Sequence, residues 1–224
     1  MKLLKYFGTL LLLLLQTPNL FADTKYPEHW WRPVIRDSST PTWEILPQEA
    51  GPGEVIVSKR NELGILSNFA ATMFLLERKK YASVEGLWQS MKYPENEQDP
   101  RATYPQIKWP FTRAQVEQMT AFEAKEAGDQ ASLLMKKMNI DWVSFNGEKF
   151  PYHTNEKGTH YKIIRSAMWE KLKQNPKVAE ILLATGNLSL RPDHQQESNS
   201  PPAWKYCEIW MEIRSQLQLG QEHD

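Results

Sequence analysis

The chain has 224 residues, of which 41% are hydrophobic, and it carries 27 basic and 27 acidic side chains. This length is that of one ordinary domain, and the balanced charge argues against a protein that grips long nucleic acid, because such proteins carry an excess of positive charge. Cys207 is the only cysteine, so no disulfide can form within the chain. We therefore expect stability to come from an apolar core, with Cys207 as a buried small side chain.

The first 22 residues have the features of a secretory signal peptide. Lys2 and Lys5 precede an apolar run at Leu10–Leu15, and the segment ends in the small residue Ala22. The apolar run is short for a helix that crosses a bilayer. We therefore expect cleavage, a mature chain that begins near Asp23 without a membrane anchor, and a periplasmic or secreted protein.

A proline-rich and tryptophan-rich arm is predicted at residues 23–53. Its prolines leave no interval long enough for a helix. We expect Trp30, Trp31 and Trp43 to pin the arm to the domain surface rather than to stack on a ligand. An alternative is that the arm exposes Trp30 and Trp31 to a partner protein of unknown identity.

Residues 54–219, ahead of a short tail at 220–224, are predicted to form one mostly helical domain with a minor strand content. Alternating apolar residues predict the strands, and capping residues with apolar stripes predict the helices. Strands are expected at Glu54–Lys59 and Thr72–Leu76. Helices are expected at Ser83–Tyr93, from Thr112 over a short stretch, from Thr120 to about Met138, and at Tyr161–Lys173, Asn175–Gly186 and Trp204–Leu219. Irregular segments are expected at Tyr93–Phe111, at Asp141–Gly158 with a tight turn at Asn146-Gly147, and at Arg191–Pro202.

The helix expected at Ser83–Tyr93 has two distinct faces. Glu85, Gln89 and Lys92 are spaced i, i+4 and i+7, which places them within roughly 60° of one another on one side. The opposite, apolar side is formed by Val84, Leu87, Trp88 and Met91. From the spacing alone, a solvated charged face on a surface helix is the more common interpretation.

These residues nevertheless resemble a known family. The segment Leu66–Ala70 (LSNFA), the helix start Ser83–Glu85 (SVE), and the following Gln89 and Lys92 resemble the NADAR superfamily of YbiA-like proteins. The resemblance extends over roughly Gly64–Leu217. It implies a single YbiA-like helical domain with a few short strands, mostly α with a minor α+β character.

The resemblance also implies an activity, because members of this family cleave N-glycosidic bonds of ADP-ribose or ribose-phosphate compounds. It assigns the nucleophile to Lys92, through a Schiff base on the opened ribose, and the acid/base role to Glu85. No metal or organic cofactor is expected. The sequence is thus identified as an N-glycoside hydrolase of the NADAR type.

A binding pocket around these two side chains follows from the same resemblance. Gln89 would hydrogen-bond ribose hydroxyls, and Ser67, Asn68 and Phe69 would hold the ribose or the base. Trp142, which matches a tryptophan that follows the family's long helix, would stack on the base. The expected ligand is a small-molecule nucleotide or an ADP-ribosylated substrate.

Without the resemblance, some of these residues have simpler interpretations. Asn68 is equally explained as a turn residue that bonds its own backbone, and Trp142 as a core side chain. Glu123 and Lys125 are interpreted as surface charges outside the site. His153 and His160 have no carboxylate or cysteine at metal-ligand spacing, and no metal site is expected.

Three departures from the family pattern leave the substrate open. Gly86 stands where the family usually has histidine, Asp129 where it has arginine, and Arg191–Pro202 replaces a glycine-rich loop. These positions help to hold base and phosphate in relatives. Two alternatives therefore stay open: a catalytically inactive protein that binds ADP-ribose or a nucleotide, and a periplasmic protein-interaction module.

Overall fold

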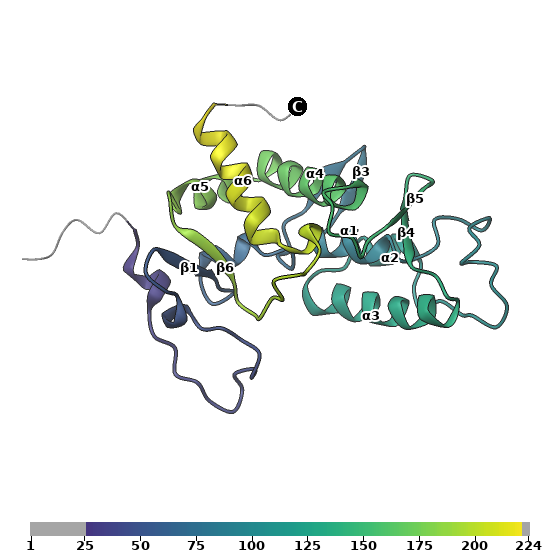
Figure 1. Ribbon diagram of the computed structural model, residues 1–224, viewed down its shortest axis with the longest axis horizontal. Helices are drawn as coiled ribbons and strands as arrows, with labels where there is room; N and C mark the ends of the chain where they lie inside the picture. The colour runs from purple at the N-terminus through teal and green to yellow at the C-terminus, as the bar shows by residue number, and fades with distance from the viewer. Residues whose placement is uncertain (1–25, 221–224) are drawn as a thin grey trace, which may run out of the picture.

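The computed structural model describes residues 26–220, so the signal peptide predicted at residues 1–22 lies outside the described residues. The described part is mostly helical with short paired strands, as predicted (Figure 1). The α-helices are α1 (Val84–Ser90), α2 (Arg113–Val116), α3 (Ala121–Lys137), α4 (Thr159–Gln174), α5 (Pro176–Ala184) and α6 (Tyr206–Gln218). The strands are β1 (Glu54–Val57), β2 (Phe74–Leu76), β3 (Lys79–Tyr81), β4 (Trp142–Phe145), β5 (Glu148–Pro151) and β6 (Ser189–Pro192). Short 3-10 helices lie at Glu28–Trp31, Pro47–Glu49, Glu62–Leu66 and Pro202–Trp204.

The strands form pairs rather than one continuous sheet. β1 and β6 pair in parallel, with Glu54 opposite Ser189, so the start of the domain is tied to the segment just before the C-terminal loop. β2–β3 and β4–β5 are antiparallel hairpins. The tight turn predicted at Asn146-Gly147 is confirmed, because both residues have positive φ and join β4 to β5. The prediction of an irregular segment from residue 141 to 158 is wrong where this hairpin forms.

α1 lies at the centre of the molecule, between α3 and α4 (Figure 1). Its N-terminus is the one predicted: the Ser83 hydroxyl accepts from the Gly86 amide at 2.9 Å and donates to the Met119 carbonyl at 2.9 Å. A Cβ at Gly86 would lie 2.6 Å from that same carbonyl oxygen, so glycine permits the close approach. Position 86 therefore packs against the connection between α2 and α3.

The helix ends earlier than predicted. α1 ends at Ser90. The Met91 and Lys92 amides then donate to the carbonyls three residues earlier, those of Trp88 and Gln89, as in a 3-10 helix. Lys92 consequently lies two residues beyond the last helical position. The helical i+7 spacing from Glu85 does not hold there.

The core lies between α1, α4, α5, α6 and the β1–β6 pair. Trp210 is fully buried and donates its indole N–H to the Leu66 carbonyl at 2.6 Å, which links α6 to the segment that precedes Ser67. Cys207 is buried in this core, as predicted, and burial raises the pKa of its thiol. Large apolar side chains thus hold the elements on which the candidate site is built.

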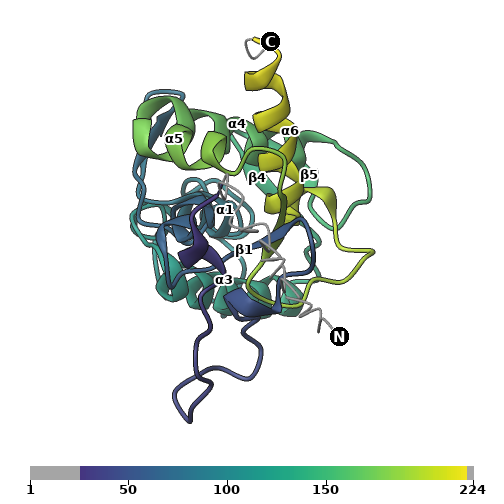
Figure 2. The same cartoon turned by 90° about the vertical axis from the view of Figure 1, so that its left-hand side faces the viewer.

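The arm packs on the domain through its first two tryptophans. Trp30 is 1% exposed and donates to Glu62 at 2.7 Å, while Trp31 donates to the Glu54 carbonyl at 2.9 Å. These two residues pin the arm, as expected, and Trp30 offers no surface to a partner. Beyond them the arm forms a loop that projects from the body (Figure 2).

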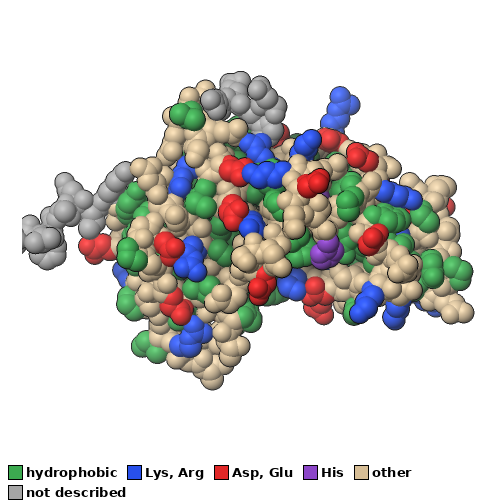
Figure 3. All heavy atoms as spheres, in the orientation of Figure 1, with side chains coloured by type: hydrophobic (Ala, Val, Ile, Leu, Met, Phe, Trp, Pro, Cys, Tyr) green, Lys and Arg blue, Asp and Glu red, His purple; other side chains and the backbone are tan. Residues whose placement is uncertain are grey.

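The surface carries mixed charge. On the face shown in Figure 3, basic and acidic side chains are interspersed, and the described residues form no basic stripe there. Within residues 26–220, no helix combines the length and apolar character needed to cross a membrane.

Candidate active site

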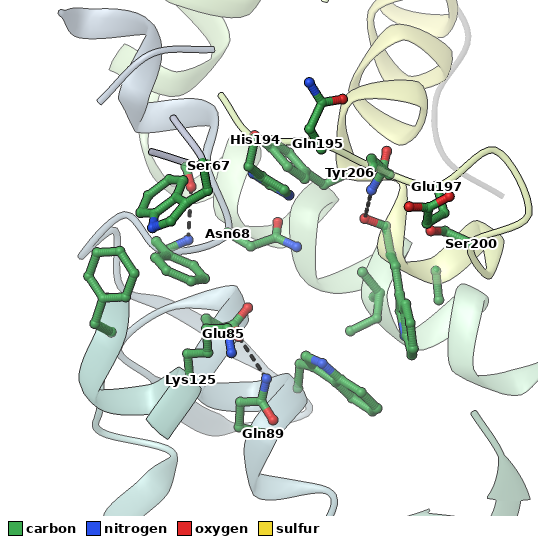
Figure 4. A pocket seen from close by; sticks show the side chains of 18 of the residues that line it. Ser67, Asn68, Glu85, Gln89, Lys125, His194, Gln195, Glu197, Ser200 and Tyr206 are labelled. Atoms are coloured by element: carbon green, nitrogen blue, oxygen red, sulfur yellow. Dashed lines mark hydrogen bonds between the residues drawn. The ribbon is translucent and has the colours of Figure 1, made fainter. Parts of the chain in front are cut away.

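A cavity of about 600 Å³ opens where α1, α3 and α4 meet the loop that follows β6. The segment Ser67–Phe69 forms one wall, Glu85, Trp88 and Gln89 of α1 form the floor, and Phe122 and Lys125 of α3 and His160 and Ile164 of α4 close two sides. The remaining lining residues are Trp43, Lys59, His194–Glu197, Ser200, Ala203, Trp204 and Tyr206. Figure 4 shows Asn68 and His194 facing the Glu85–Gln89 pair across the cavity.

The wall at Ser67–Phe69 is held from several directions. The Ser67 hydroxyl accepts from the Phe69 amide at 3.2 Å, and the Asn68 carbonyl accepts from the Glu85 amide at 3.0 Å. The Phe69 carbonyl accepts from the Ala121 amide at 3.1 Å. These bonds dock the loop on the first turns of both α1 and α3, so the three residues keep a defined position at the cavity.

Glu85 is the buried acid of the cavity. Its side chain is 7% exposed, and burial raises the pKa of its carboxyl despite the hydrogen bond from Gln89 and the positive charge of Lys92. The Gln89 amide nitrogen donates to Glu85 Oε1 at 2.7 Å. A carboxyl in this setting keeps its proton to a higher pH than a solvated one, which suits a general acid.

Unpaired polar atoms concentrate in this cavity. Asn68 Oδ1, Gln89 Oε1 and Trp204 Nε1 are buried and have no hydrogen-bond partner among the described residues. Such atoms are rare in folded proteins, because leaving a buried donor or acceptor unpaired costs about 1–3 kcal/mol. Gln89 Oε1 faces Gly128 of α3, whereas Asn68 and Trp204 provide an acceptor and a donor that a molecule bound in the cavity can satisfy.

Lys92 does not line the cavity. Its ammonium donates to Ser132 Oγ at 2.9 Å and to the Gly128 carbonyl at 3.3 Å, both on α3, and it lies 5.0 Å from the centre of the Trp88 ring. Burial lowers its pKa to about 8, against the opposing effect of the Glu85 charge. The structure thus brings Glu85 and Gln89 into the cavity and turns the Lys92 ammonium toward α3.

Trp142 does not line the cavity either, contrary to the prediction. It belongs to β4 and lies between two cations, 4.6 Å from the Arg101 guanidinium and 4.4 Å from the Lys149 ammonium. The β4–β5 hairpin, which the sequence did not reveal, sets this direction. Trp142 contributes cation–π packing at a different place in the domain.

Phe122 and Lys125 of α3 line the cavity and were not expected there. The Lys125 ammonium pairs with Asp129 at 2.6 Å, so the acidic residue at position 129 balances a cation at the cavity. The sequence held one signal for them: Phe122, Lys125 and Gly128 are each three residues apart, which places them on one face of a helix. In the structure, Gly128 on this face contacts Gln89 of α1. A glycine on a helical face allows that face to approach a neighbouring helix, so residues on the same face as Gly128 are candidates for a site between the two helices.

The loop after β6 covers the cavity and is anchored by Asp193. This carboxylate is 2% exposed, and although burial opposes it, hydrogen bonds from His194 and Lys59 hold its pKa below the ordinary value. Lys59 contacts it at 2.5 Å. On α4, the ring centre of His160 lies 4.2 Å from that of Trp88, and burial lowers the pKa of His160 to about 4, which keeps the imidazole neutral at neutral pH.

The described residues contain no group of three or more His, Cys, Asp or Glu side chains that could hold a metal ion. No protein-family model and no curated protein matches the chain. Among solved structures, the chain is similar to the NMR structure of the E. coli protein YbiA, at 16% identity, with 75% of this chain and 89% of that chain covered and a TM-score of 0.43. The function therefore has to be inferred from the chemistry of the cavity itself.

Proposed function

We propose that this protein is an N-glycoside hydrolase that cleaves the bond between ribose and a base in an ADP-ribosyl or ribose-phosphate compound. The observation that carries the proposal is the buried, proton-retaining carboxyl of Glu85 on the floor of a cavity. The unpaired acceptor Asn68 Oδ1 belongs to a residue that lines the same cavity. The resemblance of these residues to the NADAR superfamily supports the same reaction.

The reaction needs a proton for the departing base and relief of the positive charge that develops at the anomeric carbon. Glu85 supplies the proton while it is a neutral acid, and the carboxylate it leaves stabilises the charge. Ribose hydroxyls and base N–H groups are donors, and the free amide oxygen of Asn68 is an acceptor with two lone pairs, so the pairing is complementary. Gln89 keeps its N–H on Glu85, and its oxygen packs against Gly128 of α3.

Lys92 is proposed as the nucleophile. With a pKa of about 8, roughly one amine in ten is unprotonated at pH 7. The amine exchanges its bonds to Ser132 and Gly128 for the substrate and adds to the anomeric carbon, while the carbon–base bond breaks and the base takes the Glu85 proton. The Glu85 carboxylate then takes one proton from the attached nitrogen, and the second proton of that nitrogen passes to the ring oxygen, which leaves the carbon as a hydroxyl while the imine forms. Water hydrolyses the imine and returns the amine and a free ribose product.

Mass spectrometry of products tests the proposal. The purified chain is incubated with NAD, ADP-ribosylated guanosine, ADP-ribosylated side chains and ribosylamino-pyrimidine phosphates. Release of a base and a ribose product by the wild type, and not by Glu85→Gln, supports the hydrolase. Lys136→Ala changes an exposed lysine on α3 and is the matched control for the Lys92→Ala variant of the proposed nucleophile.

A second candidate is a binding protein without turnover. The observation that favours it is the engagement of the Lys92 ammonium by α3, away from the cavity. Tight binding of ADP-ribose with no product from any compound selects this function. In either case we propose an exported protein, on the features of residues 1–22.

A further inference from the structure

We propose that the N-terminal arm completes the cavity with an aromatic wall, formed by Trp43, Phe69 and Phe122, that stacks on the planar base of the ligand. The inference deepens the proposed function and rests on it for the identity of the ligand as a base-bearing ribosyl compound. It names the leaving group as a heteroaromatic base rather than an amino-acid side chain. It also gives the arm a role in the site.

The three rings come from distant parts of the chain and meet at the cavity. The Trp43 and Phe122 ring centres are 6.0 Å apart, and those of Phe69 and Phe122 are 5.3 Å apart in an edge-to-face arrangement. All three residues line the cavity. Contacts of this kind orient the rings relative to one another and leave part of the wall open.

Two of these rings are strongly exposed for their size. Trp43 is 45% exposed and Phe122 is 55% exposed. Trp30 of the same arm is 1% exposed, so the arm buries one tryptophan and presents another. Because exposed aromatic surface at a cavity is unfavourable in water, a flat apolar ligand face gains free energy by covering it.

Trp43 is held in place by its neighbour Glu44. Both carboxylate oxygens of Glu44 accept from Arg60, at 2.7 Å each, and its carbonyl accepts from Arg36 at 2.9 Å. The Ile45 amide then donates to the Asp193 carbonyl at 2.8 Å. The bidentate ion pair and these backbone contacts give the ring a defined position before any ligand binds.

Phe122 is positioned by a strained backbone. Ala121, the residue before it, has φ +50°, a conformation that side chains other than glycine rarely adopt. Its amide donates to the Phe69 carbonyl, so the strained residue links two members of the wall. Backbone strain of this kind persists where the surrounding structure holds it, and it clusters at ligand sites.

The wall borders the proposed acid. Phe69 directly follows Asn68, whose carbonyl accepts from the Glu85 amide at 3.0 Å. A base stacked on the wall therefore lies beside both the carboxyl that protonates it and the free acceptor Asn68 Oδ1, which takes an N–H from its edge. Purines and pyrimidines offer a broad aromatic face together with N–H donors. The arginine guanidinium is also planar and donates N–H, but its face is smaller and covers less of the three rings.

Calorimetric titration of the folded protein tests the wall directly. Guanosine, adenosine and cytidine are the base-bearing probes, and ribose 5-phosphate is the probe without a base. We expect Trp43→Ala and Phe122→Ala to weaken nucleoside binding by roughly 5- to 100-fold, the range found for removal of one stacking partner, and to leave ribose 5-phosphate binding within twofold. Trp43→Phe keeps a ring and is expected to retain most of the affinity.

The matched controls are Ile35→Ala on the arm and Leu133→Ala on α3, two exposed apolar side chains outside the cavity. Both are expected to bind like the wild type. No nucleoside binding by the wild type, unchanged binding by Trp43→Ala, or equal weakening for ribose 5-phosphate would each overturn the inference. Wall-dependent nucleoside binding without turnover of any glycoside supports the wall and refutes the hydrolase, so the two failures are distinguishable.

Discussion

The Gln89 side chain donates to the Glu85 carboxyl at 2.7 Å, and the absence of a side chain at Gly128 makes room for this contact. A Cβ at position 128 would lie 1.6 Å from Gln89 Oε1. α3 therefore approaches α1 closely at this point, and the glycine keeps the amide between the acid and the neighbouring helix. The geometry of the acid depends on a residue that never touches it.

Gly128→Ala is expected to push the Gln89 side chain off the acid and to lower turnover about tenfold, because a misdirected acid loses most of its advantage in proton transfer. The long Gln89 side chain can move, so the melting temperature is expected to fall only slightly. Product release and thermal unfolding, measured on the same preparation, check both parts. Unchanged turnover would show that the Gln89 contact does not position the acid.

Glu85→Gln is expected to lower turnover by at least about 10²-fold, because the amide cannot donate an acidic proton. The same change is expected to raise stability at neutral pH. The folded pKa of Glu85 is raised, so the native state binds more protons than the unfolded state, and wild-type stability falls as pH rises from the ordinary carboxyl pKa to the raised one. Thermal melts of both proteins between pH 4 and about 8 measure the difference. A variant that is less stable throughout that range contradicts the assignment.

Lys92→Ala is expected to abolish turnover and to leave the fold intact. Because the free amine is the reactive form, wild-type activity is expected to rise with pH toward a pKa of about 8, and loss of the Glu85 proton opposes this rise. Borohydride added during turnover reduces the imine and labels the lysine that forms it. A labelled Lys125 peptide, with Lys92 unlabelled, would move the nucleophile to the lysine that lines the cavity.

Lys171→Met is expected to flatten the pH dependence of stability. Lys171 is fully buried, its ammonium donates to the Ser67 carbonyl at 2.9 Å, and burial lowers its pKa to about 7. Between pH 7 and the ordinary lysine pKa the unfolded state binds more protons, so wild-type stability rises with pH, with a slope of up to about 1.4 kcal/mol per unit. Urea unfolding at pH 7, 8 and 9 measures this slope. Lys173→Met, an exposed position on the same helix, is expected to keep it.

Local sequence determined much of the secondary structure. The Ser83 cap, the Asn146-Gly147 turn and the apolar stripes of α4, α5 and α6 are decided by neighbouring residues, because capping, positive φ and helical periodicity act over a few positions. For the same reason, the spacing of Glu85 and Gln89 correctly placed them on one side of α1, and both line the cavity; the prediction that this side forms a site came from the resemblance. The position of Lys92 could not be predicted from helical spacing, because α1 ends at Ser90.

Only the tertiary structure decided what surrounds that pair. The parallel pairing of β1 with β6 joins residues 54 and 189, and the Glu44–Arg60 pair fixes Trp43 beside Phe122 in the first turn of α3. The β4–β5 hairpin turns Trp142 away from the cavity. The amino-acid sequence by itself determined which side chains can act as acid, acceptor and stacking ring. How these side chains come together depends on packing between distant segments, because the contacts between those segments offset the loss of chain entropy only once the whole core has formed.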